Sequence, residues 1–197
     1  RARAYLWKKL GLDPNDPSQW TRSVIHLQES YHDEEPWGQV MTPRIRAAHD
    51  QLLGEGTHKV PTTFGWWPVA FPGFEKGPWQ VPTKGWHVDG IHFHHYIHSW
   101  EQALLAIYLF SDIAPGGGGT ALDLGSHQIT ARILAEAEPE GLVLKDLIER
   151  VNKHPIGEVI EATGKAGDVY LMHPFIRHTR SMNTSDSVRF ICNPAAT

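Results

Sequence analysis

The stretch GDVYLMHPFIRHTRSMNTSDSVRFICNP, residues 167–194, indicates most clearly how the chain folds. Its two ends, residues 167–173 and 187–194, are short segments rich in β-branched and aromatic residues and bounded by Gly, Asp or Pro, which is typical of strands. Four earlier segments have the same character, namely residues 62–73, 103–113, 119–124 and 157–162. The sequence therefore predicts a chain built largely from short strands.

Helical spacing of apolar residues occurs in other parts of the chain. The segments concerned are residues 1–12, 43–53, 128–138 and 142–154. Pro43 lies in the first turn of the second of these, and Gly54 follows its last residue, as expected for the ends of a helix. Because the strands do not alternate one for one with helices, a doubly wound parallel sheet is disfavoured. The pattern favours a mainly β fold, an antiparallel barrel or jelly roll with flanking helices.

Composition limits the class of protein. The chain has 197 residues, of which 41% are hydrophobic and 20% charged, as expected for one soluble globular domain over residues 1–197. A net charge of −4 disfavours nucleic acid as a partner. No apolar run is long enough to span a membrane. The helical pattern begins at residue 1 without an initiator Met, so we expect terminal residues to be missing.

The single cysteine, Cys192, cannot form an intrachain disulfide. A chain with one thiol fits a reducing, intracellular and cytoplasmic setting. Cys192 itself is expected to be a small buried apolar side chain.

Candidate metal ligands occur in GWHVDG, residues 85–90. Alternate residues of a strand point to the same side, so His87 and Asp89 would project together. A second His from a distant strand would complete a set of two His and one carboxylate, which leaves one face of the metal open, as in non-haem Fe(II) oxygenases. His178 is the best candidate, because Arg189 follows it in a strand-like run and can hold a carboxylate through two parallel hydrogen bonds.

These residues give the chain a resemblance to the phytanoyl-CoA dioxygenase family of Fe(II)- and 2-oxoglutarate-dependent oxygenases, from about residue 64 to residue 194. WHVDG resembles the family's His-x-Asp segment, and GGGGTALDLGSHQ its glycine turn and the Ser-His stretch that follows. HPFIRHTRSMNTSDSVRF resembles the segment with the distal His, an Asn-x-Ser/Thr and the Arg. The resemblance implies a double-stranded β-helix, which is a cupin-like jelly roll.

The same resemblance implies a site. His87, Asp89 and His178 are then the iron ligands and the catalytic centre, and Arg189 is the anchor for 2-oxoglutarate. Arg180 departs from the family pattern, because many members carry a Ser at this position that helps to hold the same carboxylate. The neighbouring hydroxyls of Thr179 and Ser181 are the candidates to replace it.

The implied activity is oxidation, most simply hydroxylation, of an unactivated C–H bond of a small-molecule substrate. Fe(II) would be the cofactor, 2-oxoglutarate and O2 the cosubstrates, and succinate and CO2 the products. The absence of a large Lys/Arg cluster argues against a CoA thioester and favours a small metabolite. A non-catalytic jelly-roll protein that binds a metal or ligand is the alternative, and a zinc hydrolase is a second one. The match at Arg189 argues against the first alternative.

Several aromatic and polar residues have both a functional and a structural interpretation. Trp66 and Trp67 lie side by side on an expected strand, so one should face the barrel, as a wall of the substrate pocket or as core. His92 and His94 are candidate substrate contacts, and with His95 and His98 they could equally be surface imidazoles. The residues with a mainly structural expectation are Trp86 and the two histidines His127 and His173 as packing or hydrogen-bonding groups, Asn183 in a turn, and Asp33, Glu34 and Glu35 in a solvated loop.

Overall fold

The structure is a computed structural model that describes residues 1–31, 37–61 and 64–197. The acidic run at residues 33–35 therefore lies outside the described residues, as do the first two residues of the expected strand segment 62–73.

Each of the four expected helices is present. They are α1 (Ala2–Leu10), α2 (Pro43–Leu53), α3 (Ser126–Glu136) and α4 (Leu144–Val151), with a short 3-10 turn at Pro17–Gln19. The bounds of α2 agree with the prediction, and the Thr42 hydroxyl accepts a hydrogen bond of 3.3 Å from the Ile45 amide, which caps its first turn. The other helices are shorter than predicted or begin at a different residue, since helix ends are the least certain feature of an apolar pattern.

The strands agree with the predicted segments and add three more. They are β1 (Val24–Tyr31), β2 (Phe64–Ala70), β3 (Leu104–Leu109), β4 (Thr120–Asp123), β5 (Val159–Glu161), β6 (Val169–Met172), β7 (His178–Arg180), β8 (Ile191–Cys192) and β9 (Ala195–Ala196). Of the three additional strands, β1 and β9 were not expected, whereas β7 contains His178, which was expected on a strand distant from His87. The strict alternation of Ile25 and Leu27 with His26 and Gln28 is the signal that could have identified β1.

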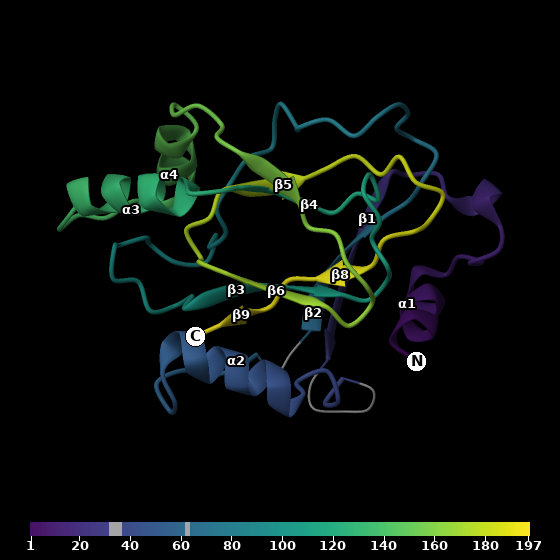
Figure 1. The fold of residues 1–197 in the computed structure, drawn as a ribbon, viewed down its shortest axis with the longest axis horizontal. Helices are drawn as coiled ribbons and strands as arrows, with labels where there is room; N and C mark the ends of the chain where they lie inside the picture. The colour runs from purple at the N-terminus through teal and green to yellow at the C-terminus, as the bar shows by residue number, and fades with distance from the viewer. Residues whose placement is uncertain (32–36, 62–63) are drawn as a thin grey trace.

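The strands form antiparallel layers, with helices outside them (Figure 1). One sheet has the order β6-β3-β8, with β9 also paired to β3, and a second has the order β5-β4-β7. β1 pairs with β2, and a bridge from Ala70 to Arg189 connects β2 to the segment that enters β8. In Figure 1, α2 runs beneath the β3 and β6 layer, while α3 and α4 lie together at one end of the molecule. The predicted combination of antiparallel strands and flanking helices is confirmed, while the described strands and α-helices contain equal numbers of residues.

Alternation along β3 separates two cores. Leu105 and Ile107 point inward, into the apolar cluster between the layers, whereas Ala106 and Tyr108 point outward, toward α1 and the segment before α2. Cys192 lies in the outer core, where burial raises the pKa of its thiol to about 12. The structure thus agrees with the expectation of a buried, unreactive cysteine.

One buried ion pair ties the layers to the helices. Arg177 is fully buried, and its Nε and Nη2 atoms donate to the Asp123 carboxylate at the end of β4. Its remaining N–H groups donate to the carbonyl group of Val151, the last residue of α4, and to those of His154 and Pro155 just beyond it. All five guanidinium donors are therefore used within the protein.

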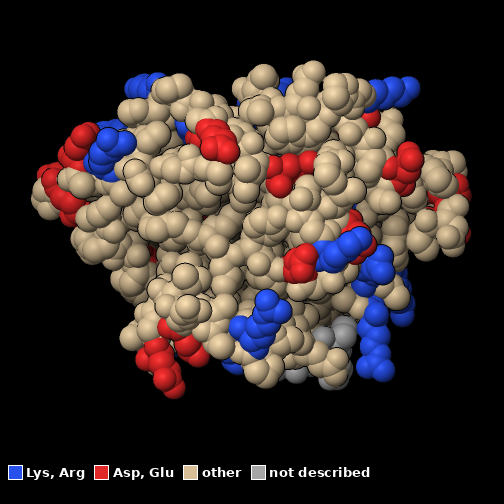
Figure 2. Space-filling model, viewed as in Figure 1, with Lys and Arg blue, Asp and Glu red and all other residues tan. Residues whose placement is uncertain are grey.

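Charges of both signs are intermixed on the face of the molecule seen in Figure 2. Some of the surface charges pair with each other, as Lys165 does with Asp112 at 2.9 Å. Within residues 1–31, 37–61 and 64–197, no helix has the length and apolar character needed to cross a membrane.

The Arg177–Asp123 pair gives a stability prediction. Arg177→Met leaves the Asp123 carboxylate buried without its cation, so the free energy of unfolding should fall by about 3–5 kcal/mol. Lys153→Ala removes only an exposed pair with Glu149 and should change it by less than about 0.5 kcal/mol. Urea denaturation of both variants and the parent protein provides the comparison. Equal stabilities of the two variants would contradict the assigned role of Arg177.

Candidate metal centre

Two backbone hydrogen bonds bring the candidate ligands together. The His87 amide donates to the His178 carbonyl at 3.0 Å, and the His178 amide donates to the His87 carbonyl at 2.9 Å. Residues paired in this way lie directly opposite each other with their side chains on one face. Their imidazole centroids are 4.5 Å apart, although the two residues are distant in the sequence. The expected strand around His87 is in fact a single isolated bridge, and Asp89 lies in a bend.

Both imidazoles are held in the tautomer that suits a metal ligand. His87 Nδ1 donates to the Gly85 carbonyl at 2.7 Å, and His178 Nδ1 donates to the Ile176 carbonyl at 3.0 Å. The Nε2 atoms are therefore left as lone-pair donors. They lie 3.5 and 3.6 Å from Asp89 Oδ1, and the three ligand atoms are all within 4.8 Å of one another.

The electrostatics of this group fit a bound cation. Burial alone would raise the pKa of Asp89, but the adjacent imidazoles of His178 and His87 hold it well below its usual range. Burial also opposes the charged form of His87, yet the Asp89 carboxylate and the Gly85 carbonyl outweigh it and raise its pKa. A carboxylate that remains charged and two imidazole nitrogens form a donor set that suits Fe(II).

The helical pair α3–α4 supports the His-x-Asp segment from behind. Val88, between the two ligands, is buried in the apolar cluster of α3 and α4. Asn152 Nδ2, after α4, donates to the Trp86 carbonyl at 3.0 Å. Trp86 is itself buried and donates through Nε1 to the Pro82 carbonyl, in agreement with its expected packing role.

Two glycines allow the chain to turn into and out of this segment. Gly85 and Gly90 have φ values of +82° and +116°, which side chains rarely permit. A Cβ on Gly85 would lie 2.8 Å from the Thr179 hydroxyl, and one on Gly90 would lie 2.5 Å from His95 Cε1. The close approach at Gly90 is fixed by His95, whose Nε2 is 2.9 Å from the Gly90 carbonyl.

The metal centre opens into a cavity of about 780 Å³ between the layers. Residues from β1, β2, β3, β7 and β8 line it, together with the loop after Asp89 and the start of α4. The lining includes His26, Gln28, Trp66, Ile91, His92, Leu105, Ile107, Leu144, Thr179, Arg180, Arg189, Ile191 and Asn193.

Arg189 is the buried cation of this cavity, with only 2% of its surface exposed. Its Nη2 donates to the Pro68 carbonyl at 2.8 Å, while its Nε is buried without a hydrogen-bond partner. Burial, and next the charge of Arg180, lower the pKa of Arg189 to about 10, so it is still charged at neutral pH. Arg177, the other buried guanidinium, has every donor satisfied. The unsatisfied donor of Arg189 therefore fits an incoming carboxylate.

The structure shows which of the two adjacent tryptophans, Trp66 and Trp67, faces the cavity. Trp66 lines the cavity and is 39% exposed, whereas Trp67 is fully buried in the outer core beside Trp37, which corrects its assignment as a substrate contact. Trp67 has this role because it points to the face of β2 that the outer core covers.

Some of the candidate histidines and hydroxyl residues line the cavity, and others do not. His92 lines the cavity, but His94 bonds through Nε2 to the Glu140 carbonyl at 2.9 Å and is not part of the lining. Thr179 lines the cavity, with its hydroxyl 3.4 Å from the Lys84 carbonyl. Ser181 is instead buried and donates to the Gly119 carbonyl, so its predicted cofactor contact is not supported.

The other imidazoles and Asn183 have structural contacts. His98 lies 3.4 Å from Glu138, and the rings of His127 and His173 are 5.3 Å apart. Asn183 Oδ1 accepts hydrogen bonds from the amide and hydroxyl of Ser185, which is the expected turn-stabilising role.

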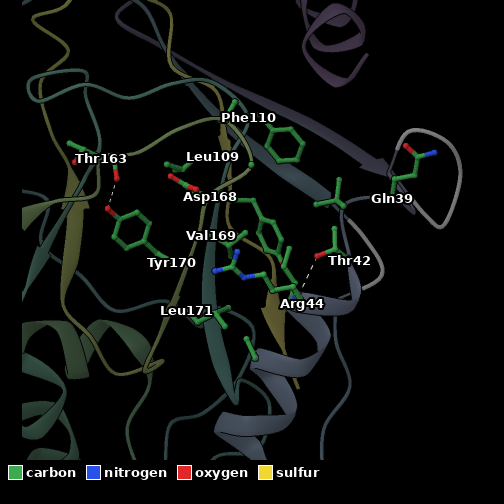
Figure 3. Close-up of a pocket in the computed structure, with 16 residues that line it drawn as sticks. Gln39, Thr42, Arg44, Leu109, Phe110, Thr163, Asp168, Val169, Tyr170 and Leu171 are labelled. Carbon is green, nitrogen blue, oxygen red and sulfur yellow. Dashed lines mark hydrogen bonds between the residues drawn. The ribbon is translucent and has the colours of Figure 1, made fainter.

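A second cavity, of about 740 Å³, lies on the outer side between α2 and β6 (Figure 3). Figure 3 shows that the Thr42 and Tyr170 oxygens are in hydrogen bonds, which join them to the Ile45 amide and the Thr163 carbonyl. The three candidate ligands do not line this cavity. The candidate metal centre therefore opens into the inner cavity.

Comparison with known proteins identifies the family. The chain matches the family described as phytanoyl-CoA dioxygenase (PhyH) over residues 18–191, and it belongs to that family. No curated protein sequence matches it.

Solved structures share the fold at low identity. EvdMO1 matches with a TM-score of 0.58 and 16% identity over 100% of this chain and 42% of that one. HygX from Streptomyces hygroscopicus, with nickel and 2-oxoglutarate bound, matches with a TM-score of 0.54 and 15% identity over 99% of this chain and 76% of that one. AviO1 from Streptomyces viridochromogenes Tue57 matches with a TM-score of 0.53 and 15% identity, over 98% and 78% of the two chains. The chain thus spans less than half of EvdMO1.

Removal of a candidate ligand should strongly weaken metal binding. His87→Ala deletes one nitrogen donor, so Fe(II) affinity measured anaerobically by calorimetry should fall at least about 100-fold. His98→Ala removes an exposed imidazole away from the centre and should leave the affinity unchanged. Circular dichroism checks that both variants are folded. Wild-type affinity in folded His87→Ala protein would remove this residue from the centre.

The backbone turn after Asp89 can be tested separately. Gly90→Ala combines a positive φ with a Cβ contact of 2.5 Å and should lower the free energy of unfolding by about 2–4 kcal/mol. Gly56→Ala also has a positive φ, but nothing lies within 4 Å of its Cβ, so a loss of about 1 kcal/mol is expected. Thermal unfolding measures both. Equal losses would show that the contact with His95 is unimportant.

Proposed function

We propose that the chain is a single Fe(II)- and 2-oxoglutarate-dependent oxygenase domain with the fold of a double-stranded β-helix. One observation carries the proposal: His87, Asp89 and His178 converge within 4.8 Å beside a cavity whose buried Arg189 has an unsatisfied donor. A protein that only bound a metal would have no reason to keep a guanidinium unsatisfied in the same cavity, because burial of such a group is unfavourable. Membership of the phytanoyl-CoA dioxygenase family supports the same function.

Each residue has a definite part in this proposal. His87 and His178 would offer Nε2, and Asp89 its carboxylate, to Fe(II). Arg189 would bind the distal carboxylate of 2-oxoglutarate through two N–H groups, whereas alternation along β7 turns the Thr179 hydroxyl away from the side that His178 and Arg180 share. Fe(II), when bound, supplies the activation of O2 that is coupled to conversion of 2-oxoglutarate into succinate and CO2.

The apolar side chains around Arg189 have a protective role. Leu105, Ile107 and Ile191 line the inner part of the cavity and exclude water from the anchored carboxylate. In such surroundings a hydrogen-bonded ion pair is stronger than in water. The same wall limits the position of a substrate to the side nearer Trp66 and His92, which we propose as substrate contacts.

The proposed reaction is hydroxylation of an unactivated C–H bond of a small molecule. A cavity of about 780 Å³ lies within the range of sites for small ligands. HygX, which has the same fold, has been crystallised with nickel, 2-oxoglutarate and hygromycin B together. The free, buried thiol of Cys192 supports a reducing cytoplasmic setting for this activity.

Arg189→Gln tests the cosubstrate site. Loss of the charge-assisted pair should weaken 2-oxoglutarate binding to the Fe(II)-loaded, oxygen-free protein by about 10- to 100-fold, while Fe(II) affinity is unchanged. Arg132→Gln, an exposed residue of α3, is the matched control and should bind both as the parent does. Calorimetric titration of each ligand is the measurement. If 2-oxoglutarate binds Arg189→Gln normally, the oxygenase assignment loses its main support.

A further inference from the structure

The charged residues of the cavity leave one cation without a role. Three of the described side chains that line the cavity are Asp, Glu, Lys or Arg, namely Asp89, Arg180 and Arg189. Asp89 faces the two imidazoles, and Arg189 has the geometry of a cosubstrate anchor. Arg180 takes part in neither arrangement.

We propose that Arg180 binds an anionic group of the substrate, a carboxylate or a phosphate or sulfate ester, while Trp66 and His26 contact the flat or ring-shaped body of that molecule. The inference rests on the proposed oxygenase function and specifies its substrate class.

The position of Arg180 suits this role. It is two residues after His178 on β7, and alternate residues of a strand point to the same side, so its side chain is directed to the cavity along with the metal-ligand imidazole. Its side chain is 45% exposed, which places the guanidinium at the boundary between the cavity and solvent. A substrate that enters toward the metal would meet it on the way.

Arg180 is held loosely in the protein. Its Nη2 is 3.4 Å from Glu75 Oε1, and its Nη1 is 3.5 Å from the Ser23 hydroxyl. Both distances exceed the roughly 2.7–2.9 Å of strong charge-assisted hydrogen bonds. The Glu75 carboxylate has another partner, since its Oε2 accepts a bond of 2.7 Å from the Asn183 amide. Arg180 can therefore exchange these contacts for a substrate anion without leaving Glu75 unpaired.

The charge of the filled cavity favours an anion. Fe(II) and doubly charged 2-oxoglutarate add charges of equal size and opposite sign, so the two arginines and Asp89 leave one net positive charge. This charge lies at Arg180, because Arg189 is paired once the cosubstrate is bound, and the Glu75 carboxylate outside the lining offsets it only through the long contact of 3.4 Å. A cationic substrate would find no available carboxylate among the described lining residues, and specificity would follow from that mismatch.

A flat surface for the rest of the substrate lies next to Arg180. His26 and Trp66 stack with centroids 4.9 Å apart and an interplanar angle of 30°. Burial, then the charges of Arg180 and Arg189, lower the pKa of His26, so its imidazole is neutral at neutral pH and does not compete for the anion. Gln28 pairs with Trp66 across β1 and β2 and lines the same wall.

The first experiment separates a substrate anchor from a second cosubstrate anchor. Oxygen-free Fe(II) protein is titrated with 2-oxoglutarate for the parent, Arg180→Gln and Arg189→Gln. Arg180→Gln should stay within about threefold of the parent, while Arg189→Gln weakens binding about 10- to 100-fold. Comparable losses in both variants would assign Arg180 to the cosubstrate, which overturns this proposal and leaves the oxygenase function in place. Normal binding by both variants would overturn the oxygenase function, and the substrate proposal with it.

The second experiment measures anion preference directly with benzoate, phenyl phosphate and neutral benzamide. Each probe is titrated by calorimetry into oxygen-free protein saturated with Fe(II) and 2-oxoglutarate. At least one of the two anions should bind about tenfold more tightly than benzamide, and the tighter anion identifies the carboxylate or the ester. Arg180→Gln should lose this preference, and Trp66→Ala should weaken all three probes alike.

The control removes a nearby charge that does not line the cavity. Lys76→Gln, next to Glu75 in the chain, should keep the preference for the anion. The proposal is overturned if the parent binds benzamide as well as the anions, if no probe binds, or if Arg180→Gln retains the preference.

Discussion

The pair of backbone hydrogen bonds between His87 and His178 is the constraint on which the site depends. It joins two segments that are far apart in the chain and sets both imidazoles on the same face. A slip of one residue in this pairing would turn one imidazole to the opposite side. The carbonyl groups of Gly85 and Ile176 then fix the tautomers, because each accepts from Nδ1 two residues away on its own segment. Register and tautomer together place the donor atoms around Asp89, so the metal centre is a consequence of strand pairing.

The pairing is held by contacts on both of its sides. Val88 anchors the first segment in the α3–α4 core, and the saturated guanidinium of Arg177 anchors the second, one residue before His178. The helical pair therefore supports the metal-binding segments, since its apolar cluster includes Val88 of the first segment and Phe175, which lies before His178 in the second. His95 adds to the support, because its backbone pairs with Leu142 in the connection between the two helices. The crowded imidazoles after Asp89 thus mostly hold the loop in place, and His92 alone among them lines the cavity.

Many of the strands and helices could be predicted from the sequence, because hydrophobic periodicity is a local feature. The ligand set followed from the resemblance to the family, since the pairing of His87 with His178 is long-range. The inward direction of Arg189 and the outward direction of Phe190 and Cys192 follow from alternation alone, and the structure has them so. Alternation could not tell which of Trp66 and Trp67 faces the cavity, since this depends on the face that α1 and the chain before α2 cover. The partners of Arg180 and the loose contact with Glu75 are also long-range, and a single sequence carries no signal for them.

Three arginines close to the site show how partner satisfaction distinguishes structure from function. Arg177 has all five donors occupied by protein groups, so a ligand could bind it only by breaking the fold. Arg189 is equally buried, yet its Nε has no partner, a state that is unfavourable until a carboxylate arrives. Arg180 has two long contacts at the cavity mouth and can change partner at little free-energy cost. Arg177 and Arg189 do not differ in charge, and both are buried. They differ in whether every guanidinium N–H has a hydrogen-bond partner in the protein, and this difference distinguishes a structural arginine from one that can bind a ligand.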